Sequence, residues 1–123
     1  MSEINSHRDL VAWQKAMDLG LLIYRLSATL PDHERFGLIS QLRRASVSVA
    51  SNIAEGYGRG STQDYLRFLR VARGGLFEID TQCLFALRLS YITQAAHEEA
   101  NKRIHECGKI LQGLIRSIEG NQN

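Results

Sequence analysis

Apolar residues recur at intervals of three and four along four stretches of the chain, the spacing of one face of an α-helix. In the first stretch, the large apolar side chains share one face: Leu10, Trp13, Met17, Leu21 and Tyr24. A second set widens this face: Ala16, Leu19, Ile23 and Leu26. This stretch therefore predicts a helix with one broad apolar face, apolar over more than one stripe. A helix of a lone bundle does not need so much apolar surface.

The other three stretches each carry an apolar seam, and the third, like the first, is apolar over more than one stripe. The second carries Leu38, Leu42, Ala45, Val49 and Ile53. The third alternates steps of four and three residues: Tyr65, Leu69, Ala72, Leu76, Ile79, Cys83 and Ala86. The fourth repeats that rhythm: Ala100, Ile104, Cys107, Leu111, Leu114 and Ile118. Such spacing is typical of helices that pack lengthwise against neighbours, as in coiled coils.

Capping signals mark where helices begin and end. Ser6 with Asp9, and Ser61 with Asp64, resemble the capping box that opens a helix. Pro31 ends the first helix, because a proline disfavours helical geometry in the residue before it. Three glycines are expected to end the second helix in the left-handed conformation: Gly56, Gly58 and Gly60.

Gly74 and Gly75 interrupt the third stretch at its middle. Each glycine inside a helix costs about 1 kcal/mol relative to alanine, so we expect a neighbouring backbone to approach closely there. No stretch shows the alternation of a strand.

Together these patterns predict an all-α fold, an antiparallel up-down-up-down four-helix bundle. The helices are expected near residues 8–29, 35–57, 62–90 and 95–118. We expect one domain over residues 1–123, ordered between about 8 and 118, with a frayed polar tail over residues 120–123. A single proline among 123 residues agrees with long, uninterrupted helices.

The composition, 44% hydrophobic and 23% charged, is that of an ordinary folded domain. No apolar run is long enough for a membrane span, so we expect no membrane association. The opening residues, MSEINSHRDL, lack the basic and apolar regions of a signal peptide. A cytoplasmic location is therefore expected, with Cys83 and Cys107 reduced and buried on the helix seams. A redox role is the minor alternative for these thiols.

Positive charge is concentrated in the middle of the chain. The net charge is +2, but residues 35–73 carry seven arginines against two acids, which gives +5. Arginine pairs well with phosphate. The candidate residues for binding a nucleic-acid backbone are Arg43, Arg44, Arg59, Arg67, Arg70 and Arg73. The alternative is that these arginines pair with acids of the same or a neighbouring subunit, which would leave an ordinary solvated face.

Glu55 stands near the expected end of the second helix, where the helix dipole opposes a negative charge. We therefore expect a nearby arginine as its partner, with Asn52 one turn earlier sharing the contact. The favoured interpretation is a structural polar cluster that fixes the second helix to the third. The alternative is a hydrolase with Glu55 as its catalytic carboxylate.

Other motifs for enzyme chemistry are missing from the sequence. The cysteines and the four histidines do not have the spacing of metal ligands. A di-iron bundle needs two Glu-x-x-His motifs, and the chain has none. The segment GYGRGS over 56–61 lacks the lysine of a phosphate-binding loop. We therefore predict no catalytic residues, no metal site and no cofactor, and a protein that is not an enzyme.

The segment SVASNIAEG over 48–56, preceded by QLRRA over 41–45, resembles the signature of the "four helix bundle protein" family. This family is also called the 23S rRNA intervening-sequence or S23 proteins. Further matching segments are WQKAM over 13–17, FGL over 36–38 and RFLRVARG over 67–74. The motif residues assigned to a structural cluster are Asn52, Glu55, Gly56 and Glu78.

The resemblance implies an antiparallel four-helix bundle that assembles as a ring of five. A related group, the accessory variability determinants of diversity-generating retroelements, works with a reverse transcriptase and its RNA. By that analogy the partners are other copies of this chain, RNA or DNA, and a reverse transcriptase. We therefore expect a non-enzymatic, oligomeric accessory factor for nucleic acid. The alternative is a protein-interaction scaffold or adaptor that binds no nucleic acid.

Overall fold

Four long helices make up most of residues 3–121, the part of the chain that the computed structural model describes. They are α1 (Val11–Ser27), α2 (Leu38–Tyr57), α3 (Thr62–Arg88) and α4 (Gln94–Gly120). Two short 3-10 turns, η1 (His7–Asp9) and η2 (Asp32–Glu34), precede α1 and α2. Because no strand occurs in the described part, the predicted all-α class is confirmed.

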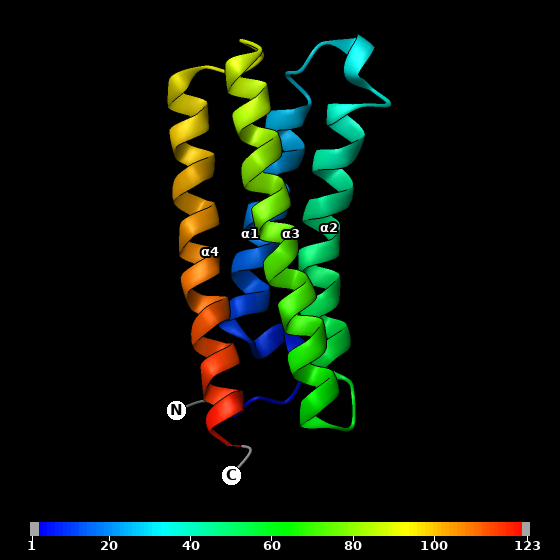
Figure 1. Cartoon of the computed structure of the whole chain (residues 1–123), viewed down its shortest axis with the longest axis vertical. Coiled ribbons are helices and arrows are strands. Elements are labelled where there is room, and N and C mark those ends of the chain that lie inside the picture. Colours follow the sequence, from blue (N-terminus) through cyan, green and yellow to red (C-terminus); the bar gives the residue numbers. More distant parts are fainter. Residues whose placement is uncertain (1–2, 122–123) are drawn as a thin grey trace.

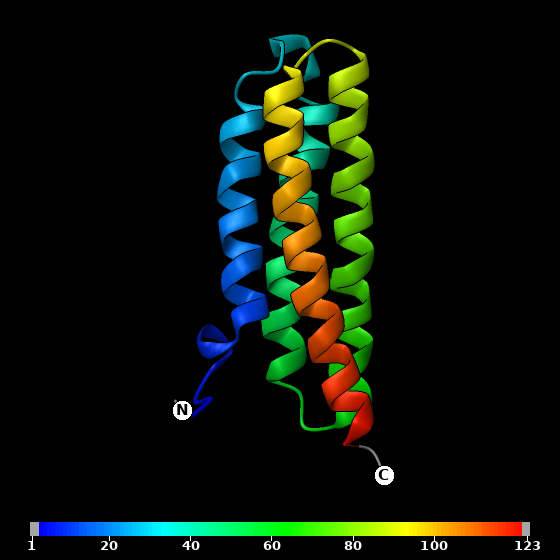
Figure 2. The ribbon, with the colours of Figure 1, turned by 90° about the vertical axis from the view of Figure 1, so that its left-hand side faces the viewer.

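Successive helices run in opposite directions around a bundle (Figure 1). Each helix packs against its neighbours in the chain, and α1 also packs against α4, which closes the ring of four. The helix α3 therefore lies diagonally across from α1, and α2 across from α4. Figure 2 shows α4 in front, with α1 and α3 on either side of it. No helix in residues 3–121 combines the length and the apolar character needed to cross a membrane.

The predicted seams of α2, α3 and α4 form the core. Eleven of their members are less than 2% exposed: Leu42, Val49, Ile53, Leu69, Ala72, Ile79, Cys83, Ala86, Ala100, Cys107 and Leu111. Leu114 and Ile118 of the fourth seam are only partly buried, and Ile115 is buried beside them. The predicted seams are therefore confirmed as the core-facing sides of these three helices.

The predicted apolar face of α1 is buried on one side only. Met17, Leu21 and Tyr24 are exposed, whereas Leu10 is buried and Trp13 is partly buried against the core. The residues expected to widen the face are all buried, and Ala12 is buried with them: Ala16, Leu19, Ile23 and Leu26. Small alanines let α1 approach its neighbours closely, while the larger side chains remain at the surface. The exposed Met17, Leu21 and Tyr24 therefore form an apolar stripe on the outside of the bundle.

Helix ends differ from the predicted bounds by a few residues. The Ser6–Asp9 capping box is present, but it caps the turn η1, and Leu10 is extended before α1 begins at Val11. The third helix ends at Arg88 because Ser90 adopts a left-handed φ of 62°. The amides of Ser90 and Tyr91 then donate to the last free carbonyls of α3. The predicted frayed tail lies partly outside the described residues, since α4 continues to Gly120 and residues 122–123 are not described.

The glycines between α2 and α3 are not there for left-handed turns, which corrects the prediction. No described glycine has a positive φ. Gly56 belongs to α2 and is buried against α3, where an added Cβ would lie 2.8 Å from Phe68 Cβ. Gly75 faces α2, and an added Cβ would lie 2.8 Å from Val49 Cγ2. The expected close approach at the middle of α3 is therefore real at Gly75, whereas Gly74 has open space beside it.

Candidate interaction surfaces

Arg43 of α2 holds the end of α1. Its Nε donates to Ser27 Oγ at 2.8 Å and its guanidinium lies 4.8 Å from the centre of the Tyr24 ring. Ser27 is fully buried and donates in turn to the Tyr24 carbonyl oxygen. A cation is favourable here because the C-terminus of a helix carries partial negative charge. Arg43 therefore contributes to the packing of α1 on α2.

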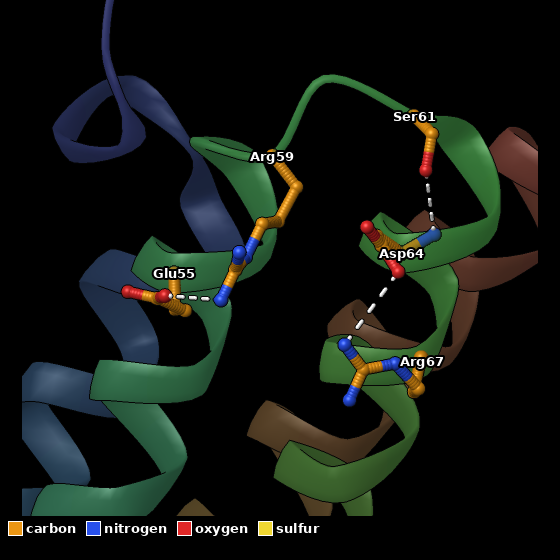
Figure 3. A network of polar contacts seen from close by, with 5 residues as sticks. All are labelled: Glu55, Arg59, Ser61, Asp64 and Arg67. Atoms are coloured by element: carbon orange, nitrogen blue, oxygen red, sulfur yellow. Dashed lines mark hydrogen bonds and ion pairs between the residues drawn. The ribbon is translucent and has the colours of Figure 1, made fainter.

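Two further arginines are paired around the turn that joins α2 to α3 (Figure 3). Arg59 reaches back along α2 to Glu55, with 2.8 Å between Nη2 and Oε1. Arg67 lies 3.5 Å from Asp64, whose backbone amide donates to Ser61 Oγ and so caps α3. Both guanidinium groups also lie within 5 Å of the centre of the Phe68 ring. The charges at this turn are therefore balanced.

Arg70 and Arg73 reach from α3 to α4. Arg70 Nη2 lies 2.7 Å from Glu119 Oε2, and Arg73 Nη1 donates to Gln112 Oε1 at 2.8 Å. Five of the six candidate arginines thus have a polar partner within the chain. The sixth, Arg44, is exposed on α2 and lines a polar hollow between α2 and α3. The six do not form one open cationic face.

The four motif residues occupy separate places along α2 and α3. Glu55 pairs with Arg59 just beyond the end of its own helix, and Asn52 donates to the carbonyl oxygen and Oγ of Ser48. Glu78 lines the polar hollow with Arg44, and Gly56 lies at a point of close approach between α2 and α3. Of these four, Gly56 is the one that brings the two helices together.

The side chains considered above for catalysis or metal binding have few reactive side chains near them. Glu55 and His7 line one shallow hollow of about 420 Å³ beside Arg59. Within residues 3–121, no group of three or more His, Cys, Asp or Glu side chains is placed to hold a metal ion. Burial raises the pKa of the Cys83 thiol to about 12 and that of the Cys107 thiol to about 11. At neutral pH both cysteines are therefore thiols rather than reactive thiolates.

An apolar groove between α1 and α2 is the feature that the helical pattern did not reveal. Its volume is about 240 Å³, and small residues form its floor: Ala16, Gly20, Ser46 and Ala50. Met17, Leu21, Tyr24 and Val47 form its rims and are all exposed, Leu21 by 54%. In the sequence, the one indication of this groove is that the first helix is apolar over more than one stripe.

A second apolar surface lies on the outside of α3. Val71, Phe85 and Leu89 are exposed, Phe85 by 59%. Val71 and Phe85 are separated by two heptads, and Leu89 follows one turn later, so the three share a face. The exposed Glu78 lies on the same face, one heptad from Val71 and one from Phe85, so a charge stands between the apolar side chains. We call Val71, Phe85 and Leu89 the α3 stripe. The stripe belongs to α3, whereas the groove is lined by α1 and α2. In Figure 1, α3 lies in front of the bundle and α1 behind it.

The family assignment rests on a match over most of the chain. The model of a family described as 23S rRNA-intervening sequence protein matches residues 8–113, a range that runs from η1 into the last third of α4. The chain belongs to this family. The match includes both the α1/α2 groove and the α3 stripe.

A solved member of the same family has the same fold. It is a protein of unknown function from the S23 ribosomal protein family of Bacteroides thetaiotaomicron, whose crystal structure was determined at 1.70 Å resolution. The two chains are 25% identical, and the TM-score is 0.79. The match covers 85% of this chain and 98% of that chain. No similar protein is found among the curated ones.

Proposed function

We propose that this member of the 23S rRNA-intervening sequence family is a non-enzymatic scaffold that assembles from several copies of itself. The observation that carries the proposal is the pair of exposed apolar surfaces, the α1/α2 groove and the α3 stripe. Large apolar side chains that gather at an exposed surface are typical of sites that contact a partner. The candidate arginines support a scaffold more than a nucleic-acid surface, because most of them are engaged within the chain.

The positions of the two surfaces favour a ring. The groove is concave and has small residues at its floor, while the α3 stripe projects large side chains such as Phe85. Because they lie on different helices of one bundle, the stripe of one copy fits the groove of the next. Such head-to-tail contacts close into a ring when the rotation per copy allows it. The ring of five implied by the family resemblance is the assembly that we propose.

Light scattering coupled to size exclusion tests this proposal. The wild-type chain should elute as a multiple of 13.9 kDa at micromolar concentration. Leu21→Arg places a charge at the rim of the groove, because Leu21 is exposed there, and should yield the 13.9 kDa monomer with unchanged helix content. Gln14→Arg adds the same charge to an exposed position of α1 outside the groove and should leave the assembly intact. A wild-type particle of 13.9 kDa would contradict the proposal.

A role as an accessory factor for nucleic acid is the second candidate, and one observation favours it. The ion pairs of Arg59, Arg67 and Arg70 join exposed side chains, and such pairs contribute little. Their guanidinium groups can therefore exchange a carboxylate for a phosphate. A ring also multiplies the +5 segment, so weak contacts of each copy add up.

Binding of labelled RNA and duplex DNA at about 50 and 200 mM salt tests this second candidate. Affinity that rests on several phosphate contacts should fall by orders of magnitude over this range. Replacing Arg44 and Arg67 by alanine should lower both the affinity and the salt dependence while the assembly persists. No binding at the lower salt by the folded oligomer would rule it out and leave the scaffold alone.

A further inference from the structure

A second groove runs between α3 and α4, away from the α1/α2 groove. Its volume is about 720 Å³, three times that of the α1/α2 groove at 240 Å³. The two helices that form it stand side by side in Figure 1. The groove is lined by residues of both: Arg73, Leu76, Phe77, Asp80, Ile104, His105, Gly108, Lys109, Gln112 and Arg116.

The floor of this groove is apolar. Leu76 and Ile104 belong to the buried core and close the groove from below. Gly108 of α4 carries no side chain, and an added Cβ there would only touch Leu76 Cδ1 at 3.8 Å. Phe77 stands beside the floor and is 68% exposed. Within residues 3–121, no side chain covers the exposed ring of Phe77, although the ring stands beside an apolar floor.

The rim of the groove is strongly cationic. Arg73, Lys109 and Arg116 line it, and none of the three forms an ion pair with another described residue. Arg73 is held instead by the neutral amide of Gln112. That hydrogen bond sets the register of the antiparallel pair, so Asp80, seven residues along α3, falls beside His105. Among the lining residues, the single acid therefore lies at one end of the groove, with Lys109 near the middle and Arg73 and Arg116 toward the other end.

We propose that this groove binds an acidic amphipathic helix of a partner protein. Residues 104–116 of α4 extend about 18 Å, which matches three turns of a bound helix. Lys109 and Arg116 are seven residues apart, about 10.5 Å along α4, so carboxylates seven residues apart on the bound helix meet them in turn. Its apolar face covers Phe77 and the floor. This is the helix-in-groove mode of recognition, and charge complementarity selects an acidic helix.

A nucleic acid fits the same groove less well. A phosphate backbone would satisfy the three cations, but it would leave Phe77 and the apolar floor against a charged, hydrated chain. An amphipathic helix satisfies both features at once. The proposal goes beyond self-assembly, because the groove lies outside both the α1/α2 groove and the α3 stripe.

A designed peptide provides the test. The probe is a fluorescein-labelled helix of about 16 residues with leucines on one face and two glutamates seven residues apart beside them. It should bind the assembled wild-type protein in a fluorescence-anisotropy titration. Replacing both glutamates by glutamine should weaken binding roughly tenfold, because two partly exposed ion pairs are lost.

Two matched pairs of variants locate the binding site. Gly108→Met fills the groove and should abolish peptide binding, whereas Gly113→Met adds the same side chain to an exposed glycine of α4 that has open space around it. Lys109→Glu should weaken binding, whereas Lys102→Glu, an exposed position of α4 outside the groove, should not. All four variants should keep the wild-type assembly size, so the result does not depend on self-association.

Three results would overturn the inference. The first is no peptide binding by the wild-type protein, or equal binding by Gly108→Met. The second is equal affinity for the glutamate and glutamine peptides. The third is loss of assembly in Gly108→Met, which would make this groove a contact between copies. Single-stranded RNA that binds wild type but not Lys109→Glu, with no peptide binding, would assign the groove to nucleic acid instead.

Discussion

Arg43 and Arg44 are adjacent in the sequence and have different surroundings. Both carry the charge and residue type of a phosphate ligand, and the sequence offers no means of separating them. The structure turns Arg43 toward Ser27 and Tyr24, sixteen and nineteen residues earlier in the chain, and leaves Arg44 exposed. Arg70 and Glu119 are likewise 49 residues apart. The sequence therefore identifies the arginines but cannot assign partners that only tertiary packing brings together.

This difference predicts unequal effects on stability. Arg43→Ala should lower the free energy of unfolding by about 1–3 kcal/mol, because it removes a charged donor from the buried Ser27 hydroxyl. Arg44→Ala should change it by no more than about 0.5 kcal/mol, since Arg44 is exposed. Urea unfolding followed by circular dichroism measures both. Equal effects of the two substitutions would show that Arg43 does not hold α1 against α2.

Glu34 links two loops at one end of the bundle. One carboxylate oxygen accepts from the Leu38 amide at the start of α2, and the other accepts from the Tyr91 hydroxyl at 2.9 Å. These hydrogen bonds, the Leu38 amide first, lower the pKa of Glu34 below its ordinary 4.5. The same contact raises the pKa of Tyr91 above its ordinary 10.0. The link is therefore fully formed in the pH range between these two values.

Stability should accordingly depend on the protonation of Glu34. A carboxyl whose pKa is lower in the folded state stabilises the fold above its unfolded pKa, and this contribution is lost as the pH falls through the folded value. Glu34→Ala should therefore lower the melting temperature at pH 7 by several degrees and much less at pH 3. Glu99→Ala, at an exposed position of α4, controls for the loss of one negative charge. A pH-independent difference between wild type and Glu34→Ala would contradict the contact.

At the scale of the elements, the spacing of apolar residues predicted all four helices and three of the four buried faces. It was only partly right for α1, because this helix is apolar over a broad surface and periodicity alone does not show which part of it is buried. The larger side chains, such as Leu21, favoured the exposed face, while Ala12 and Ala16 lie at the core. The end of α3 was missed by two residues, because a serine rather than a glycine takes the left-handed position. In α1, a prediction that favours the larger side chains therefore failed, because close packing against the other helices required small residues.

Two glycines provide a test of the close packing between α2 and α3. Gly56→Ala should lower the free energy of unfolding by about 1–3 kcal/mol, because the new Cβ would lie 2.8 Å from Phe68 Cβ and 3.2 Å from the Tyr65 carbonyl oxygen. Gly74→Ala should raise it by about 0.5–1 kcal/mol, because the position has open space and alanine favours the helix. Thermal and urea unfolding of the two variants measure these opposite signs. Stabilisation by Gly56→Ala would show that the helices are farther apart.

At the scale of the whole molecule, the sequence already indicated more apolar surface on the first and third helices than one bundle buries. It could not show where that surface lies, because the position of a groove depends on which faces the four helices turn toward one another. The structure places one apolar surface between α1 and α2 and the other on the outside of α3. In the proposed ring, the contacts would join unlike faces, the stripe of one copy and the groove of the next.

Mixing two assembly variants tests this central claim most directly. Leu21→Arg disables the groove and Phe85→Glu disables the α3 stripe, so each variant alone should be a 13.9 kDa monomer by light scattering. A mixture still offers one intact groove and one intact stripe, and it should therefore form a one-to-one heterodimer that grows no further. If the surfaces instead pair with their own kind, each variant alone would remain a dimer through its intact surface, and that result would contradict the account.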